Sequence, residues 1–240
     1  ISLLFEDLFG LISRILSLAI LISGRGSNLI KLIEAIDHDN LEAEIRIVIS
    51  NKLCDGIKHA AARGIPTKII ERQSFATRRE HDAAIQHTID ASDAKFVFLA
   101  GYMAILSPEF TKTFSGRLVN IHPSLLPNFK GLDTHQRVID AGATRHGATV
   151  HLVNAEIDDG PIILQAELSV LPEDNADRLA ARVLKLEHKL YPFVLKNLCD
   201  GKLTLTADKV TWHHHDTNLQ AMLTSAGLYF AQSLRWPKTL

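Results

Sequence analysis

The sequence has few cysteines, no excess of charge and no long uninterrupted apolar run. Only 2 of its 240 residues are cysteines. Cys54 and Cys199 are too far apart for the spacing of a metal or redox motif. They suit a reducing compartment such as the cytoplasm, where unpaired thiols persist. The formal net charge of -1 shows no basic excess. We therefore expect no nucleic-acid partner, and any anionic ligand must be bound by a local site.

The chain also lacks a segment typical of secretion or of membrane insertion. Residues 1–17 are apolar but are interrupted by Glu6, Asp7 and Arg14. A signal peptide would have a basic start and an unbroken apolar run, and a membrane helix would need about 20 apolar residues. We expect residues 1–17 to be an extension outside the fold and residues 208–240 to be a peripheral tail. No membrane association is expected.

Between these ends the composition and the periodicity indicate one globular α/β domain. Hydrophobic residues make up 46% of the chain and charged residues 22%, which is ordinary for a globular protein. Apolar runs typical of buried strands alternate with helical patterns from residue 18 to residue 122. This alternation predicts a doubly wound, mostly parallel, Rossmann-like sheet. Two later strands, at residues 147–153 and 161–170, suggest an antiparallel C-terminal extension before a long helix at 174–198.

A glycine-containing loop follows the first predicted strand. Its sequence is SGRGSN, with Gly24 and Gly26 allowing a tight turn and with Ser27 and Asn28 opening the next helix. Backbone N–H groups at a helix N-terminus favour an anion, and the carboxyl ends of parallel strands are where open sheets bind ligands. The simpler alternative is a strand-to-helix turn in which Ser or Asn only caps the helix. The loop has neither the Gly-Lys-Ser/Thr of a Walker loop nor the third glycine of a dinucleotide fingerprint.

A second polar group of residues comes at the end of the predicted strand RLVNIH. Asn120 and His122 are two residues apart, so their side chains face the same side of the sheet. Asp158, in the acidic turn EIDDG, could reach the imidazole. A carboxamide, an imidazole and a carboxylate are the groups needed for acyl-type transfer through a tetrahedral intermediate. The alternative is that His122 caps the strand and Asp158 is only a turn residue.

The remaining histidines do not form a metal motif. We expect several of them to be surface residues or helpers: His81, His87, His146, His151 and His188. The run His213-His214-His215-Asp216 lies in the tail and has no regular ligand spacing. No metal site is predicted.

Four segments in this order and spacing resemble the phosphoribosylglycinamide formyltransferase family. They are SGRGSN, AGYMAIL, NIHPSLLP and DDGPIILQ. NIHPSLLP is shared across the formyltransferase superfamily, whereas the glycine loop with Ser-Asn is typical of its purine-synthesis family. The resemblance covers nearly the whole folded part. It implies a formyltransferase domain at residues 18–207, with an N-terminal ribonucleotide-phosphate half and a C-terminal folate half.

The resemblance also implies an activity and the residues that carry it. A formyl group would pass from 10-formyltetrahydrofolate to the amine of glycinamide ribonucleotide, in purine synthesis and without a metal. Both substrates are small molecules. A homodimer is one assembly that the chain could form. The implied catalytic residues are Asn120, His122 and Asp158. The implied ribonucleotide contacts are Gly26, Ser27, Asn28 and Glu187. The implied folate contacts are Arg78, Met103, Ala104, Ile105, Leu106 and Asn120.

The chain departs from the family pattern at three positions. Ala104 stands where many relatives have Arg. If the arginine side chain contacts the folate in those relatives, this chain lacks that contact and should bind folate less tightly. Asp159 stands where relatives often have Gly, and it adds a second charge beside Asp158. Asp133 stands where some relatives have His. We expect Asp158 to keep the catalytic role.

Three rival functions share parts of this pattern. A methionyl-tRNA formyltransferase would need a further RNA-binding domain and a basic surface. A formyltetrahydrofolate deformylase would carry an N-terminal regulatory domain. A catalytically silent nucleotide-binding protein could use the same fold, since fold does not determine function. The set Asn120, His122 and Asp158 argues against the last.

Overall fold

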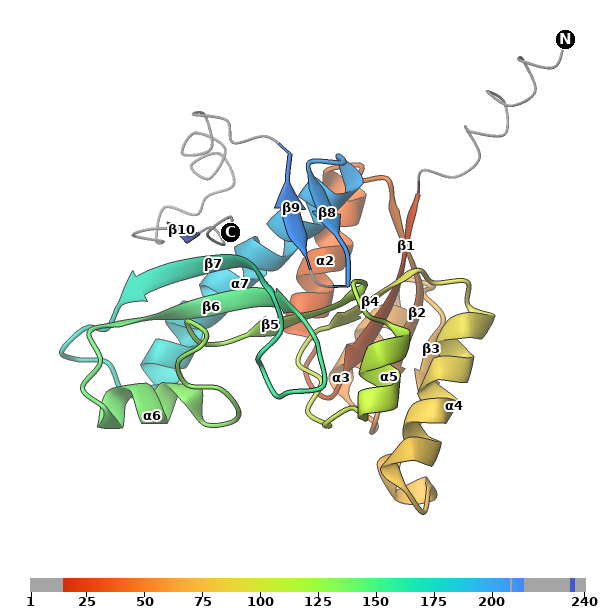
Figure 1. Cartoon of the computed structure of the whole chain (residues 1–240), viewed down its shortest axis with the longest axis horizontal. Helices are drawn as coiled ribbons and strands as arrows, with labels where there is room; N and C mark the ends of the chain where they lie inside the picture. Colours follow the sequence, from red (N-terminus) through yellow and green to blue (C-terminus); the bar gives the residue numbers. More distant parts are fainter. Residues whose placement is uncertain (1–14, 208, 214–233, 236–240) are drawn as a thin grey trace, which may run out of the picture.

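The structure is a computed structural model that describes residues 15–207, 209–213 and 234–235 (Figure 1). Its main sheet has 8 strands in the order β10-β7-β6-β5-β4-β1-β2-β3. These strands are β1 (Leu16–Ile22), β2 (Ala43–Ser50), β3 (Thr67–Ile69), β4 (Phe96–Leu99), β5 (Leu118–His122), β6 (Arg145–Leu152), β7 (Ile162–Ser169) and β10 (Leu234–Arg235). A small second sheet pairs β8 (Leu203–Leu205) with β9 (Val210–Trp212).

Helices connect these strands and cover the sheet. They are α2 (Ser27–His38), α3 (Asp55–Ala61), α4 (Arg78–Ala91), α5 (Pro108–Thr113), α6 (Thr134–Asp140) and α7 (Ala176–Cys199), with a short 3-10 turn η1 (Arg72–Ser74). Strands β1 to β5 pair in parallel, and β6, β7 and β10 pair antiparallel. The predicted doubly wound, mostly parallel sheet with an antiparallel C-terminal extension is confirmed. None of the described helices is long and apolar enough to cross a bilayer.

The central strand β1 is buried on both faces, which explains its continuous apolar sequence. Leu18 and Ile20 belong to the core that α2 and α7 cover. Ala19 and Leu21 belong to the opposite core, which includes Ile85 of α4. Successive side chains of a strand point to opposite faces, so one apolar run supplies both layers. In Figure 1, α2 and α7 lie beside each other, while α4 and α5 lie together elsewhere on the sheet.

Several boundaries differ from the sequence prediction. Strand β1 begins at Leu16, so two residues assigned to the N-terminal extension belong to the sheet. Residue 207 was predicted to end the domain, yet it lies inside the β8–β9 hairpin, where Thr206 N–H donates to Lys209 O at 2.9 Å. Trp212 also packs on the domain, because its indole N–H donates to the Ile163 carbonyl at 3.2 Å.

Helix α6 is a further element that the sequence pattern did not indicate. It has only 7 residues, and its N-cap residue Asp133 is in the left-handed conformation without a side-chain capping bond. Only Thr134 and Val138 are buried. A helix with a single buried apolar side chain and no capping signal has too little periodicity to be recognised.

The long helix α7 is tied to the middle of the sheet by one buried hydroxyl. Tyr191 is fully buried and stacks on Phe98 of β4 with ring centroids 5.1 Å apart. Its Oη lies 3.2 Å from the carbonyl of Leu99 and 3.1 Å from that of Val119. It therefore joins α7 to the two strands, β4 and β5, whose carboxyl ends lead into the site.

We expect Tyr191→Phe to lower the free energy of unfolding by about 1 kcal/mol, the usual net contribution of a hydrogen bond. Urea unfolding at neutral pH would measure this change. Tyr102→Phe is the matched control, because the buried Tyr102 hydroxyl has no hydrogen-bond partner among the described residues. Removing it should cost nothing. Equal losses in the two variants would contradict the role given to the Tyr191 hydroxyl.

Candidate active site

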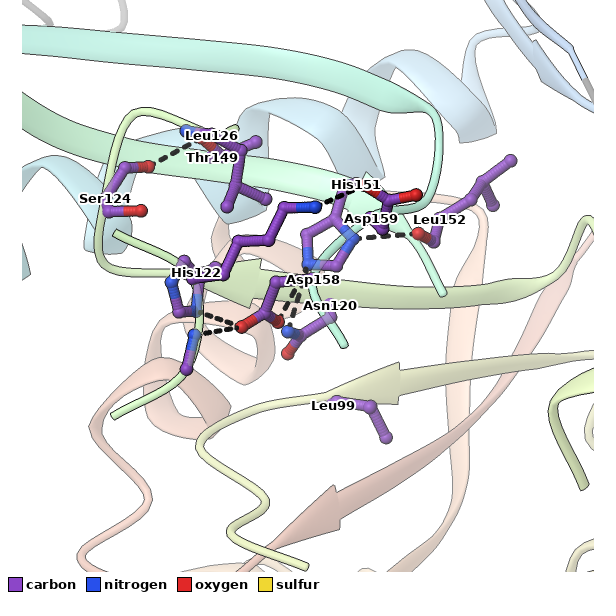
Figure 2. A network of polar contacts seen from close by, with 12 residues as sticks. Leu99, Asn120, His122, Ser124, Leu126, Thr149, His151, Leu152, Asp158 and Asp159 are labelled. Carbon is purple, nitrogen blue, oxygen red and sulfur yellow. Dashed lines mark hydrogen bonds and ion pairs between the residues drawn. The ribbon is translucent and has the colours of Figure 1, made fainter. Parts of the chain in front are cut away.

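The pairing of β5 with β6 brings the central polar side chains together. The two strands are antiparallel, with Asn120 opposite His151 and His122 opposite Thr149. Directly opposed residues in an antiparallel pair point to the same face. The structure thus places Asn120 and His122 on one face of the sheet and adds His151 to them (Figure 2).

Asp158 reaches this face from the loop between β6 and β7. Its Oδ2 lies 3.3 Å from Nδ1 of His122, so the predicted contact is present. The same oxygen accepts a hydrogen bond from the backbone N–H of Gly131 at 2.8 Å. Asp158 has a left-handed backbone, with φ of 50°. That conformation is costly for a residue other than glycine and persists only where surrounding contacts maintain it.

His122 is buried and faces an acceptor at each ring nitrogen. Its exposed fraction is 6%. Nδ1 faces the Asp158 carboxylate, and Nε2 lies 3.1 Å from the carbonyl oxygen of Phe129. Ionised carboxylates and carbonyl groups only accept hydrogen bonds. The surroundings therefore suit an imidazolium, which carries an N–H at both nitrogens.

His151 is a site residue whose role the sequence did not reveal. Its Nδ1 lies 2.8 Å from the Leu152 carbonyl and must donate to it. Burial lowers the pKa of His151 to about 4, against the opposing effect of the Leu152 hydrogen bond and of Asp158. At neutral pH its Nε2 is therefore an acceptor, and it receives a hydrogen bond from Asn120 Nδ2 at 3.1 Å.

The neutral form of His151 has two consequences for its neighbours. Asp158 Oδ1 lies 3.8 Å from His151 Nε2, but this contact is no ion pair at neutral pH because the ring is uncharged. The bond to His151 also fixes the amide orientation of Asn120. An amide nitrogen has two hydrogens, so one can still donate to a substrate oxygen. The sequence could have pointed to His151 only if the β5–β6 register, which places it opposite Asn120, had been known.

The loop after β5 is fastened across the same face of the sheet. Thr149 Oγ1 donates to the Ser124 carbonyl at 2.6 Å, and Leu126 N–H donates to Thr149 Oγ1 at 3.1 Å (Figure 2). Gln165 of β7 donates to the Leu126 carbonyl at 2.9 Å. These bonds hold the start of the loop, and its far end then returns to His122 and Asp158 through Phe129 and Gly131.

The predicted anion loop lies at the carboxyl end of β1. Gly26 precedes α2 in the left-handed conformation, with φ of 75° and no side-chain capping bond. A Cβ on Gly26 would lie 2.7 Å from Gly56 Cα. The close approach that requires glycine is therefore made by α3 of the protein itself. The N–H groups of the first turn of α2 have no partner within the helix.

Asn28 and Glu187 join this loop to α7. The Asn28 amide donates to Glu187 Oε2 at 2.7 Å, and both side chains are buried. Burial raises the pKa of Glu187 to about 7, although the bond from Asn28 opposes the shift. The two residues that the sequence assigned to one ligand are thus in direct contact. The buried Asn28 Oδ1 has no partner among the described residues.

The segment after β4 lies between the anion loop and His122 in the strand order, since β4 separates β1 from β5. Ser23 ties it to β1: Ser23 N–H donates to Gly101 O at 3.1 Å, and Met103 N–H donates to Ser23 Oγ at 2.8 Å. Met103 and Ile105 are 70% and 55% exposed, as a ligand contact would need.

Other members of the predicted folate set differ in exposure. The Leu106 side chain is buried in the core, so only its backbone could serve a ligand. Ala104 is partly exposed. Arg78 is exposed in the first turn of α4, where the capping box of Thr77 and Glu80 starts the helix.

The other histidines only partly match the expectation. Three of them are buried, each with 1% exposure, and are therefore not surface residues: His81, His146 and His151. His87 is exposed and His188 is partly buried. His213 contacts the Thr204 hydroxyl at 2.7 Å, while the rest of its run, residues 214–216, lies outside the described residues. The described residues contain no cluster of three or more metal-ligating side chains.

Comparisons with known proteins identify a family and several relatives of this chain. The pattern of a family described as formyl transferase matches residues 16–195. The phosphoribosylglycinamide formyltransferase of Haemophilus influenzae is 43% identical over 189 residues, which are 78% of this chain and 89% of that protein. The solved phosphoribosylglycinamide formyltransferase of Coxiella burnetii has a TM-score of 0.78 and 44% identity, covering 82% of this chain and 93% of that one. A glycinamide ribonucleotide transformylase of Symbiobacterium toebii reaches 0.80 at 32% identity, covering 84% and 95%.

For the anion loop, we expect Gly26→Ala to lower the free energy of unfolding by about 1–3 kcal/mol, the cost of a left-handed non-glycine residue. The contact with Gly56 adds to this cost. Gly24→Ala is the control, because a Cβ there meets nothing within 4 Å. Urea unfolding of both variants would measure the difference. If Gly24→Ala were the more damaging change, the packing described for the loop would be wrong.

For His151, we expect a contribution to stability that disappears in acid. Its pKa falls from the ordinary 6.5 to about 4 in the folded chain, so the unfolded chain binds more protons between these values. The contribution is complete above about pH 6.5 and is lost as the pH falls towards 4. Unfolding of the wild type and of His151→Gln should be compared from pH 7.5 downward, a range set by this pKa shift. The wild type should lose more stability, and parallel curves would contradict the shift.

Proposed function

The chain belongs to the formyl transferase family, and we propose that it transfers a formyl group from 10-formyltetrahydrofolate to the amine of glycinamide ribonucleotide. The products are formylglycinamide ribonucleotide and tetrahydrofolate, in purine synthesis. The observation that carries this proposal is the contact of His122 with Asp158 beside Asn120. The matched relatives are named for this same activity.

The site supports a direct transfer without a covalent intermediate on the protein. The ribonucleotide amine attacks the formyl carbon, and the carbonyl oxygen becomes an oxyanion in the tetrahedral intermediate. Asn120 Nδ2 and the His122 imidazolium are the donors that stabilise this charge. The intermediate collapses when a proton of the attacking amine is transferred to N10 of the folate, the bond between the formyl carbon and N10 breaks, the C=O bond re-forms and tetrahydrofolate leaves. Asp158 balances the positive charge on His122 throughout.

The departure at Asp159 fits this mechanism. A second carboxylate beside Asp158 would oppose the ionisation of its neighbour. Asp159 instead pairs with Lys130, and its side chain is 51% exposed. The two aspartates thus have separate partners, and Asp158 keeps its contact with His122. The catalytic assignment stays with Asp158.

The ribonucleotide is proposed to bind across the anion loop and α7. Backbone N–H groups at the start of α2, from Gly26 to Asn28, suit its phosphate. Glu187 is a buried acceptor in contact with this loop, since it accepts a hydrogen bond from Asn28. Hydroxyl groups of the ribose could donate to it. These contacts would place the substrate amine towards the end of β5, because all the parallel strands present their carboxyl ends at one edge.

The folate is proposed to lie along the segment after β4. Exposed Met103 and Ile105 offer apolar contact, and the backbone from Met103 to Leu106 offers hydrogen bonds. Arg78 could attract a carboxylate of the folate tail. If the backbone makes the hydrogen bonds to the folate, an alanine in place of arginine at position 104 should have little effect on folate binding.

These contacts follow the division into two halves only in part. The anion loop precedes β4 and residues Met103 to Leu106 follow it, but Arg78 of the folate set lies before β4 and Glu187 of the ribonucleotide set lies on α7. The two free cysteines suit a reducing compartment such as the cytoplasm. A homodimer stays a prediction.

Incubation of the purified chain with glycinamide ribonucleotide and 10-formyltetrahydrofolate should yield the formylated ribonucleotide. Tetrahydrofolate should appear in equal amount, because transfer releases one molecule for each formyl group moved. Mass spectrometry of the ribonucleotide and absorbance of the folate would measure both products. Release of free formate in place of formylated product would indicate a hydrolase, and absence of both products from folded protein would overturn the proposal.

We expect His122→Ala to lower kcat by about 10²–10³-fold, as for the loss of an oxyanion-stabilising donor. Binding of the ribonucleotide should survive, since the anion loop belongs to β1 and α2 and not to β5. Steady-state kinetics and calorimetry would measure the two effects separately. Activity equal to the wild type would remove His122 from the mechanism.

A further inference from the structure

We propose that the ion pair between Lys130 and Asp159 positions the catalytic pair, by holding the 129–131 turn against the loop that carries Asp158. The inference rests on the proposed function, because its effect is on the formyl-transfer step. We assign Lys130 and Asp159 a positioning role, since their side chains pair with each other. Figure 2 shows the Asp159 contact beside His151 and Asp158.

The ion pair joins the same two segments that the catalytic contacts join. Phe129, immediately before Lys130, offers its carbonyl to His122 Nε2 at 3.1 Å. Gly131, immediately after Lys130, donates its N–H to Asp158 Oδ2 at 2.8 Å. Lys130 Nζ donates to Asp159 Oδ1, and Asp159 follows Asp158. Loosening the pair would therefore weaken the restraint on the two backbone groups that flank Lys130.

The backbone around the ion pair would not keep this shape unaided. Phe129, Gly131 and Asp158 have φ values of 55°, 78° and 50°. Left-handed residues other than glycine require support from their surroundings. The Lys130–Asp159 pair supplies such support directly between the two strained segments.

Arg137 of α6 supports the turn from its other side. Its Nη1 donates to the carbonyls of Lys130 at 2.6 Å and of Leu132 at 3.2 Å. Its guanidinium lies 5.8 Å from the centre of the Phe129 ring. Arg137 holds the turn to α6, whereas Lys130 holds it to the Asp158 loop. Of these two interactions, only the Lys130–Asp159 pair therefore links the turn to the loop that carries Asp158.

The expected effect is modest because the pair is partly exposed. The side-chain exposures are 35% for Lys130 and 51% for Asp159. Pairs of this exposure change an equilibrium by about two- to five-fold. We expect a change of this size in kcat. The KM for the ribonucleotide should not change, because the anion loop lies on other elements.

The test is a double-mutant cycle of Lys130→Gln and Asp159→Asn in the full chain. Each single variant should lower kcat about two- to five-fold. The double variant should be no slower than the single ones, because both changes remove one interaction. Lys130→Arg keeps the charge and should retain most of the activity. Amide exchange of Gly131, followed by NMR, should become faster in the variants as its bond to Asp158 opens more often.

A matched control pair lies on β2, away from the site. Arg46 Nη2 and Glu44 Oε2 are 3.1 Å apart, with side-chain exposures of 42% and 48%. Arg46→Gln and Glu44→Gln should leave kcat and Gly131 exchange unchanged. The comparison distinguishes an effect specific to the location of the Lys130–Asp159 pair from an effect that the loss of any surface ion pair would have.

Two results would overturn the positioning role. One is an unchanged kcat in both single variants together with unchanged Gly131 exchange. The other is a cycle in which the two losses in kcat simply add. An inactive wild type would instead count against the proposed function, so the two failures are distinguishable. Thermal unfolding of each variant checks that the chain still folds.

Discussion

The contact between the His122 imidazole and the Asp158 carboxylate determines how the rest of the site is built. The His122 ring is buried, and its two nitrogens face the Asp158 carboxylate and the Phe129 carbonyl. They come from two different loops, so both loops must be held in place for the ring to be useful. The hydrogen bonds of Thr149 and Gln165 hold the loop after β5, and Phe129 and Asp158 adopt left-handed conformations in the two loops.

The sheet places the two proposed substrate sites and the polar residues after different strands. The anion loop follows β1, the exposed apolar segment follows β4, and the polar residues follow β5. In the strand order, β4 lies between β1 and β5. Parallel strands present their carboxyl ends at one edge. Under the proposed function, a ribonucleotide and a folate would approach that edge from neighbouring positions and meet at Asn120 and His122.

Burial gives similar residues different charges around this site. His151 is kept neutral by burial, with a pKa of about 4, and so can accept a hydrogen bond from Asn120. Glu187 has its pKa raised to about 7 by burial and contacts the Asn28 amide. Asp159, by contrast, is half exposed and has a lysine partner. The charge that each group carries thus follows from its depth and its neighbours, and not from its residue type alone.

The sequence by itself determined the order of the elements and the candidates for the chemistry. The alternation of apolar runs predicted the sheet, because a strand buried on both faces must be apolar throughout, as in β1. The spacing of Asn120 and His122 put both on one face, since strand periodicity is local. Short elements such as α6 were missed, because a single buried apolar residue leaves no pattern.

Only the tertiary structure decided which distant groups meet. The roles of His151, of the Phe129 carbonyl and of Lys130 depend on strand register and on left-handed turns. Those are fixed by contacts between segments far apart in the chain, which no local sequence pattern encodes.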